Sequence, residues 1–143
     1  MLAIALVWLV SCAPTPTAPS PAVQQAERAF AITRANAPVL MASGEGRLVA
    51  LTLKNLGAAR IEADGGVTYR WEGPGDPLKG DREPLPVAVP PGASVDLVVP
   101  IVAPLTVGSY TLVWSVVDSS GTFEAQGDAR TRVEVRAPDA RAN

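Results

Sequence analysis

The chain has 143 residues, which suits one domain, and an apolar fraction of 48%, which is sufficient for a packed core. Its 12 basic and 14 acidic residues give a formal net charge of −2, so the composition gives no reason to expect a nucleic-acid partner. Because this sequence has no histidine and one cysteine, it excludes Ser-His and Cys-His nucleophile pairs, histidine metal sites, CxxC redox chemistry and an internal disulfide.

The first element is a short hydrophobic leader over residues 1–12. Residues 2–10 read LAIALVWLV without a polar interruption, and Ser11 and Cys12 follow. A helix over these residues would be about 18 Å long, which is too short for the roughly 30 Å hydrocarbon core of a bilayer. An apolar run of this length at an N-terminus is typical of the h-region of an export signal.

The end of this leader, Leu9-Val10-Ser11-Cys12, resembles the lipobox of bacterial lipoproteins. In that family the signal is cut before the cysteine, whose sulfur receives a diacylglycerol. The resemblance implies lipidation of Cys12 and an extracytoplasmic location, in the periplasm or on the outer face of the cell membrane, with the membrane as a partner. Two alternatives remain: an uncleaved leader embedded in the membrane, and Cys12 as an ordinary small apolar residue.

Residues 13–28 are predicted to be a proline-rich linker. Pro14, Pro16, Pro19 and Pro21 fix the backbone and remove hydrogen-bond donors, which makes the segment a semi-rigid spacer. Ten such residues would extend roughly 30 Å. The linker is what a tethered domain needs, but it does not identify a partner.

The folded body is expected over residues 29–136, followed by a flexible tail at 137–143. Apolar and polar residues alternate over residues 47–55, 67–72, 94–99, 110–116 and 130–136, with turn residues between these segments. Short strands at this spacing predict an all-β fold, an antiparallel β-sandwich. The side chains predicted to face the core are Val49, Leu51, Leu53, Val67, Tyr69, Trp71, Val95, Leu97, Val99, Tyr110, Trp114, Val133 and Val135.

Several strand ends also carry a family resemblance. The stretch 51–57 (LTLKNLG), the strand 108–114 (GSYTLVW) and the hairpin 117–127 resemble, in this order, immunoglobulin-like domains found beside bacterial surface and glycan-handling proteins. These domains are related in shape to the central domain of the autophagy receptor "next to BRCA1". The resemblance implies an immunoglobulin-like sandwich, in which Tyr110 is either a tyrosine corner or an ordinary buried aromatic residue.

Carboxylates are the remaining catalytic groups. Asp76, Asp81 and Glu83 share one loop with Lys79 and Arg82, and acid pairs can hydrolyse glycosidic bonds, but the neighbouring cations favour solvated loop charges. A calcium site formed by Asp118, Glu124 and Asp128 is a second possibility, although the spacing is not that of an EF-hand loop. We therefore expect no enzyme activity, no cofactor and no metal.

Two functions follow as hypotheses. The first is a non-catalytic accessory subunit that docks on and stabilises a larger membrane protein complex of the secretion, respiratory or photosynthetic type. The alternative is an envelope-tethered glycan-binding module, which requires an exposed Trp71 or Phe123 because sugars stack on flat rings. The candidate interaction surface comprises Trp71, Asp76, Lys79, Asp81, Arg82 and Phe123.

Overall fold

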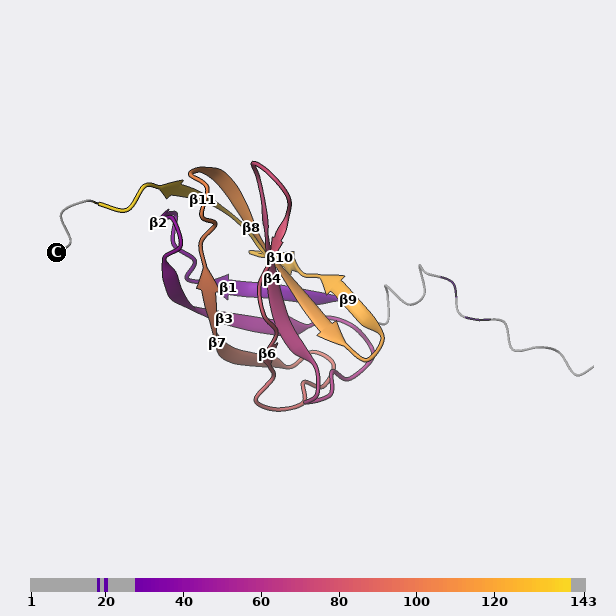
Figure 1. The fold of residues 1–143 in the computed structure, drawn as a ribbon. Coiled ribbons are helices and arrows are strands. Elements are labelled where there is room, and N and C mark those ends of the chain that lie inside the picture. Colours follow the sequence, from indigo (N-terminus) through magenta and orange to yellow (C-terminus); the bar gives the residue numbers. More distant parts are fainter. Residues whose placement is uncertain (1–17, 19, 21–27, 140–143) are drawn as a thin grey trace, which may run out of the picture.

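The computed structural model describes residues 18, 20 and 28–139, and all regular structure in this part of the chain is β-strand (Figure 1). The predicted leader, the predicted lipidation site at Cys12 and most of the predicted linker lie outside the described residues. Within the described part, no helix has the length and apolar character needed to cross a membrane.

Eleven strands are present among the described residues. They are β1 (Phe30–Ala35), β2 (Leu40–Ala42), β3 (Gly46–Asn55), β4 (Gly66–Glu72), β5 (Leu78–Lys79), β6 (Glu83–Pro84), β7 (Ser94–Val102), β8 (Gly108–Asp118), β9 (Gly121–Glu124), β10 (Gln126–Gly127) and β11 (Arg130–Arg136). Each of the five predicted strands is present, and four of them extend beyond their predicted bounds by one to three residues, while the strand at 130–136 has the predicted bounds.

The strands form two sheets, and the predicted all-β sandwich is confirmed (Figure 1). The first sheet has the order β10-β1-β3-β7, and the second has the order β2-β11-β8-β4-β5, with β6 also pairing with β4 and β9 with β8. Most pairs are antiparallel, as predicted. The exceptions among the described strands are β1 with β10 and β2 with β11, which are parallel pairs at sheet margins.

The core lies between the two sheets, and every side chain predicted to face it is buried. The longest pairing joins β3 to β7, where Val49 lies opposite Val99 and Leu51 opposite Leu97. Aromatic rings fill the centre in edge-to-face contacts, with Tyr69 5.9 Å from Trp114 between ring centroids. This geometry is the preferred one for aromatic pairs, and here it joins the neighbouring strands β4 and β8 of the second sheet.

The described chain enters the domain at one end of β8. Arg28 forms an ion pair with Asp118, the last residue of that strand. Tyr110 lies near the other end of β8, and the eight residue steps between them span roughly 26 Å at about 3.3 Å per residue. Features near Tyr110 are therefore far from the point at which the N-terminal segment joins the sandwich.

Candidate interaction site

The site is built around β5, the strand at the margin of the second sheet. In its register with β4, Leu78 lies opposite Trp71 and Lys79 lies opposite Arg70. Because side chains opposite each other in a sheet share a face, Leu78 points to the core side and Lys79 to the outer side. This short strand consequently separates an apolar region from a basic one.

On the core side of β5 lies a hollow of about 560 Å³, here called the apolar groove. It opens between β5 and the end of β7, the marginal strand of the first sheet. Three aliphatic side chains around it are exposed: Leu78 (47%), Val102 (55%) and Leu105 (83%). The lining residues are Tyr69, Trp71, Pro74, Gly75, Asp76, Leu78, Lys79, Val102, Ala103, Pro104, Leu105, Thr106 and Tyr110.

The floor of the apolar groove is aromatic, and its polar atoms are already bonded to the groove wall. The Tyr69 hydroxyl accepts a hydrogen bond from the Val102 N–H (2.9 Å), and Trp71 Nε1 donates to the Val102 carbonyl (2.8 Å). The Tyr110 hydroxyl donates to the Thr106 carbonyl (3.0 Å), which identifies Tyr110 as a tyrosine corner. These three bonds hold the wall at residues 102–106 and leave mainly carbon surface facing the groove.

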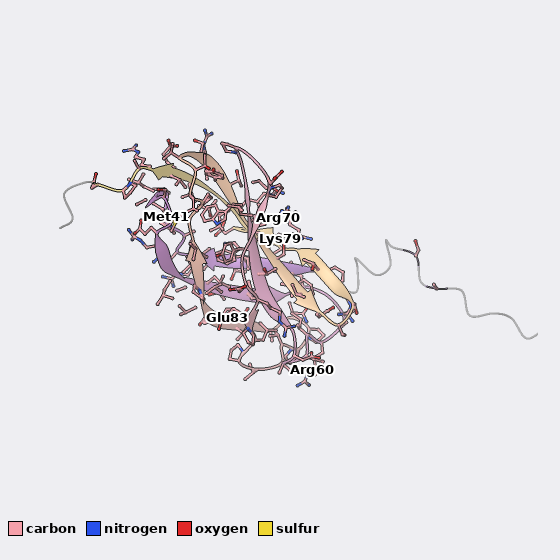
Figure 2. All side chains as sticks on the ribbon, in the orientation of Figure 1. Met41, Arg60, Arg70, Lys79 and Glu83 are labelled. Carbon is pink, nitrogen blue, oxygen red and sulfur yellow. The ribbon has the colours of Figure 1, made fainter. Side chains whose placement is uncertain are left out.

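On the outer side of β5 lies a second hollow of about 390 Å³, here called the basic hollow. Its lining includes the cationic side chains of Arg70, Lys79 and Arg82 and no carboxylate. Figure 2 shows Arg70 beside Lys79, well separated from Arg60 near the opposite end of the molecule. The remaining lining residues are Thr68, Tyr69, Gly80, Ser115, Val117 and Thr122.

Beside the basic hollow, four charged side chains form a closed ion-pair network. Arg70 contacts Glu72 (2.7 Å) and Glu124 (2.8 Å), and Arg130 contacts Glu72 (2.9 Å) and Glu124 (2.7 Å). The network links β4, β9 and β11 across β8, where Val113 is fully buried on the outer face. It was not predicted from the sequence, because its members are up to 60 residues apart.

The network shifts the titration of its members. Hydrogen bonds from Arg70, then from Arg130, lower the pKa of Glu124 below its ordinary value of 4.5. The Arg70 hydrogen bond also leads the causes that lower the pKa of Glu72. Carboxyl groups whose pKa is lowered by folding stabilise the fold above their unfolded pKa, and this contribution is lost as the pH falls through the folded value.

We therefore expect the network to make the domain acid-sensitive below about pH 4.5. The difference in melting temperature between pH 7 and pH 3 should be smaller in the double variant Glu72→Gln/Glu124→Gln than in the wild type. The control is Glu62→Gln, whose carboxylate is 67% exposed and lies 3.9 Å from Arg60. Equal pH dependence in all three proteins would show that the network has no role in acid stability.

The two aromatic residues of the predicted interaction surface are not exposed rings, and for Trp71 this agrees with its predicted position facing the core. Trp71 is only 2% exposed because its ring lies in the core against Tyr69 and Tyr110, so it is not a surface residue. Phe123 is half-buried because its ring packs edge-to-face on Phe30, 5.9 Å away between centroids. Neither residue offers the exposed flat ring that sugar stacking needs.

The charged residues of the predicted surface do lie on the outside. Asp76, Lys79, Asp81 and Arg82 are all exposed, and Asp76 and Lys79 line the apolar groove, while Lys79 and Arg82 line the basic hollow. The structure therefore gathers three of these four at one sheet margin. Glu83, considered as a partner in an acid pair, lies in β6.

The residues considered for calcium are separated by other contacts. Asp118 pairs with Arg28, and Glu124 belongs to the ion-pair network. Among the described residues, no group of three acidic or thiol side chains is placed to hold a metal ion.

The groove wall at residues 102–106 was not predicted from the sequence. Leu105 is the most exposed large aliphatic side chain among the described residues, and it touches the Gly44 turn. The signal available in the sequence was the apolar stretch 98–107 with only Thr106 as a polar residue. This stretch continues through Pro100, directly after Val99, where the predicted strand ends.

Comparison with known proteins supports the fold alone. No protein-family model matches the sequence, and no curated protein matches it. The solution structure of a CARDB domain from Pyrococcus furiosus is similar, with 15% sequence identity, a TM-score of 0.50, and coverage of 76% of this chain and 95% of that one. The crystal structure of that domain in complex with di-metal ions gives 15% identity, a TM-score of 0.51, and coverage of 79% and 97%. The chain thus has an immunoglobulin-like β-sandwich fold similar to that of a CARDB domain.

Proposed function

We propose that this protein is a non-catalytic, membrane-anchored extracytoplasmic subunit that docks on and stabilises a larger membrane protein complex. The observation that carries the proposal is the apolar groove with its exposed rim of Leu78, Val102 and Leu105. Apolar surface gathered in one place on a small domain is typical of a surface that a partner covers.

The location of the groove supports the same proposal. The N-terminal segment joins the sandwich at the Asp118 end of β8, whereas the groove lies near Tyr110 at the other end. A lipid anchor at Cys12 and a linker over residues 13–28 would therefore hold the domain without covering the groove. The lipobox resemblance supplies the anchor in this proposal, and the groove supplies the docking surface.

The experiment measures the native size of the protein in mildly solubilised membranes for the wild type and for two leucine variants. We expect the wild type to migrate with a large assembly and Leu105→Asp to migrate near its own mass, because a carboxylate at the groove rim opposes apolar docking. The control is Leu56→Asp, which introduces the same charge at an exposed leucine far from the groove.

Two results would contradict the proposal. If the wild type migrates at its own mass in every mild detergent, it is not part of a larger assembly. A change in its tryptophan fluorescence on addition of envelope polysaccharides would then favour the glycan-binding alternative. Loss of the assembly in Leu56→Asp as well as in Leu105→Asp would show that docking does not depend on the groove.

A further inference from the structure

We infer that β5 is a docking edge for an extended segment of a partner protein in which apolar residues alternate with acidic residues. This inference rests on the proposed function and names the chemistry of the partner segment. It follows from three features of the β5 margin: an open main-chain edge, an apolar groove on one side and a basic hollow on the other.

The main-chain edge is the first feature. The Gly80 N–H donates to the Tyr69 carbonyl (2.8 Å), so the main-chain groups of Gly80 face β4. Successive residues of a strand direct these groups to opposite edges, and those of Lys79 therefore point away from β4. Because β5 ends the order of its sheet among the described strands, an added strand has a donor and an acceptor to pair with.

The two hollows are the second and third features, and they set the side-chain pattern of the partner. In an added strand, alternate side chains would point to opposite faces of the sheet. Those on the core side would enter the apolar groove beside Leu78, and those on the outer side would lie over the basic hollow beside Lys79. The partner segment must therefore alternate apolar and acidic residues.

Charge complementarity favours an acidic partner. Arg70 is shared with Glu72 and Glu124, whereas Lys79 and Arg82 form no ion pair among the described residues. The stem of Arg82 lies against Gly66, since a Cβ at position 66 would be 2.6 Å from Arg82 Cγ. Because Lys79 and Arg82 line the same hollow, they attract carboxylates, and such charge pairs govern specificity and association rate.

A protein segment fits this margin better than a glycan does. The rings that line the apolar groove are buried to 6% exposure or less, and their polar atoms are bonded to residues 102–106. They leave no ring face for sugar stacking, whereas aliphatic side chains can fill the groove. The open edge at Lys79 additionally matches a polypeptide backbone.

The test uses the full-length protein in its native membranes, with the photoreactive residue p-benzoylphenylalanine at position 78. Cross-linked peptides are identified by mass spectrometry. We expect a partner segment with alternating apolar and acidic residues, and we expect Lys79→Glu/Arg82→Glu to lower the cross-linked yield about tenfold or more. The matched control is Arg60→Glu, an exposed arginine at the other end of the molecule (Figure 2).

A second pair of variants tests the edge itself. Lys79→Ala removes the charge, and Lys79→Pro removes the charge and the edge-facing N–H. We expect the proline variant to give a further loss of cross-linked yield beyond the alanine variant, with the melting temperature reported alongside to show that both domains remain folded. Equal yields would show that the main-chain edge is not used.

The outcomes separate the inference from the proposed function. The wild type could still migrate with an assembly while its cross-links reach a segment without acidic residues, or while the charge reversal leaves the cross-linked yield unchanged. Either result overturns the inference and leaves the proposed function standing. A wild type that migrates alone and forms no cross-link overturns both. If it then binds polygalacturonate, and the charge reversal abolishes that binding, the basic hollow serves an acidic glycan instead of a protein.

Discussion

Replacing Asn55 by alanine is expected to destabilise the domain by about 3 kcal/mol, because it leaves buried polar groups without partners. The Asn55 side chain is completely buried at the end of β3. Its amide donates to the carbonyls of Ala59 (2.8 Å) and Val89 (3.0 Å), and its oxygen accepts from the Gly57 N–H (3.0 Å). These bonds join two loops that are distant in the sequence.

In Asn55→Ala, two of the three main-chain groups that bond to the Asn55 side chain lose their hydrogen-bond partner. The Val89 carbonyl retains a hydrogen bond from the Ile61 N–H (3.0 Å) after the substitution, whereas the Gly57 N–H and the Ala59 carbonyl depend on Asn55. Two unsatisfied groups at about 1 to 3 kcal/mol each give the expected total.

Thermal and denaturant unfolding provide the measurement. A loss of about 3 kcal/mol should lower the melting temperature by roughly 10 to 20 °C in a domain of this size. The control is Asn36→Ala, because Asn36 is exposed and its replacement should change stability by less than about 0.5 kcal/mol. Similar melting temperatures for the two variants would contradict the structural role of the Asn55 amide.

Strands with one buried face and one solvated face were predictable from the amino-acid sequence. Residues 47–55 and 94–99 were predicted as strands because this arrangement requires alternating side chains. The predicted end at residue 99 was too early, since β7 continues through Pro100 to Val102. The Ala103 N–H donates to the carbonyl of Glu45, which directly precedes β3, so the missing N–H of Pro100 falls on the free edge, where proline is tolerated.

Strands without clear alternation were missed. In β1, a register shift between Ile32 and Arg34 interrupts the period, and Ala31 is buried alongside Ile32. The strands β2, β5, β6 and β10 have only two or three residues each, which is too short for any periodic signal. Such short strands form because a longer neighbouring strand offers main-chain groups to pair with. Which segments become neighbours depends on the tertiary fold and is not visible in the local sequence.

The candidate site was only partly accessible to sequence reasoning for the same reason. The charges of Asp76, Lys79 and Arg82 mark the β4–β5 hairpin as a polar surface, and this was predicted. The apolar groove also needs a wall from residues 102–106 and the floor residue Tyr110, which reach the hairpin only through sheet packing. Phe123 was placed on the surface because the sequence does not show its contact with Phe30.

Trp71→Phe is expected to destabilise the domain by about 3 kcal/mol, whereas Trp114→Phe should cost about 1 kcal/mol. Both tryptophans are buried in the same core, and both substitutions remove the same volume. Their indole N–H groups differ: that of Trp71 donates to the Val102 carbonyl (2.8 Å), while that of Trp114 has no hydrogen-bond partner among the described residues.

This difference determines the expected order of the two variants. Trp71→Phe leaves a cavity and breaks a bond between the sheets, whereas in Trp114→Phe the cavity cost is offset by the removal of an unpaired polar group. Chemical denaturation gives both free energies of unfolding. An equal loss would contradict the role assigned to the Trp71 bond, because packing alone would then explain both values.

The Trp71 bond also connects the core to the apolar groove. Val102 is held from both sides, by the Trp71 N–H at its carbonyl and by the Tyr69 hydroxyl at its N–H. Release of one of these bonds should loosen the wall at residues 102–106, so Trp71→Phe should raise amide hydrogen exchange in that segment while Trp114→Phe leaves it unchanged. Unchanged exchange in both variants would mean that the wall is held by Leu105 and its neighbours, and that the groove does not depend on the aromatic floor.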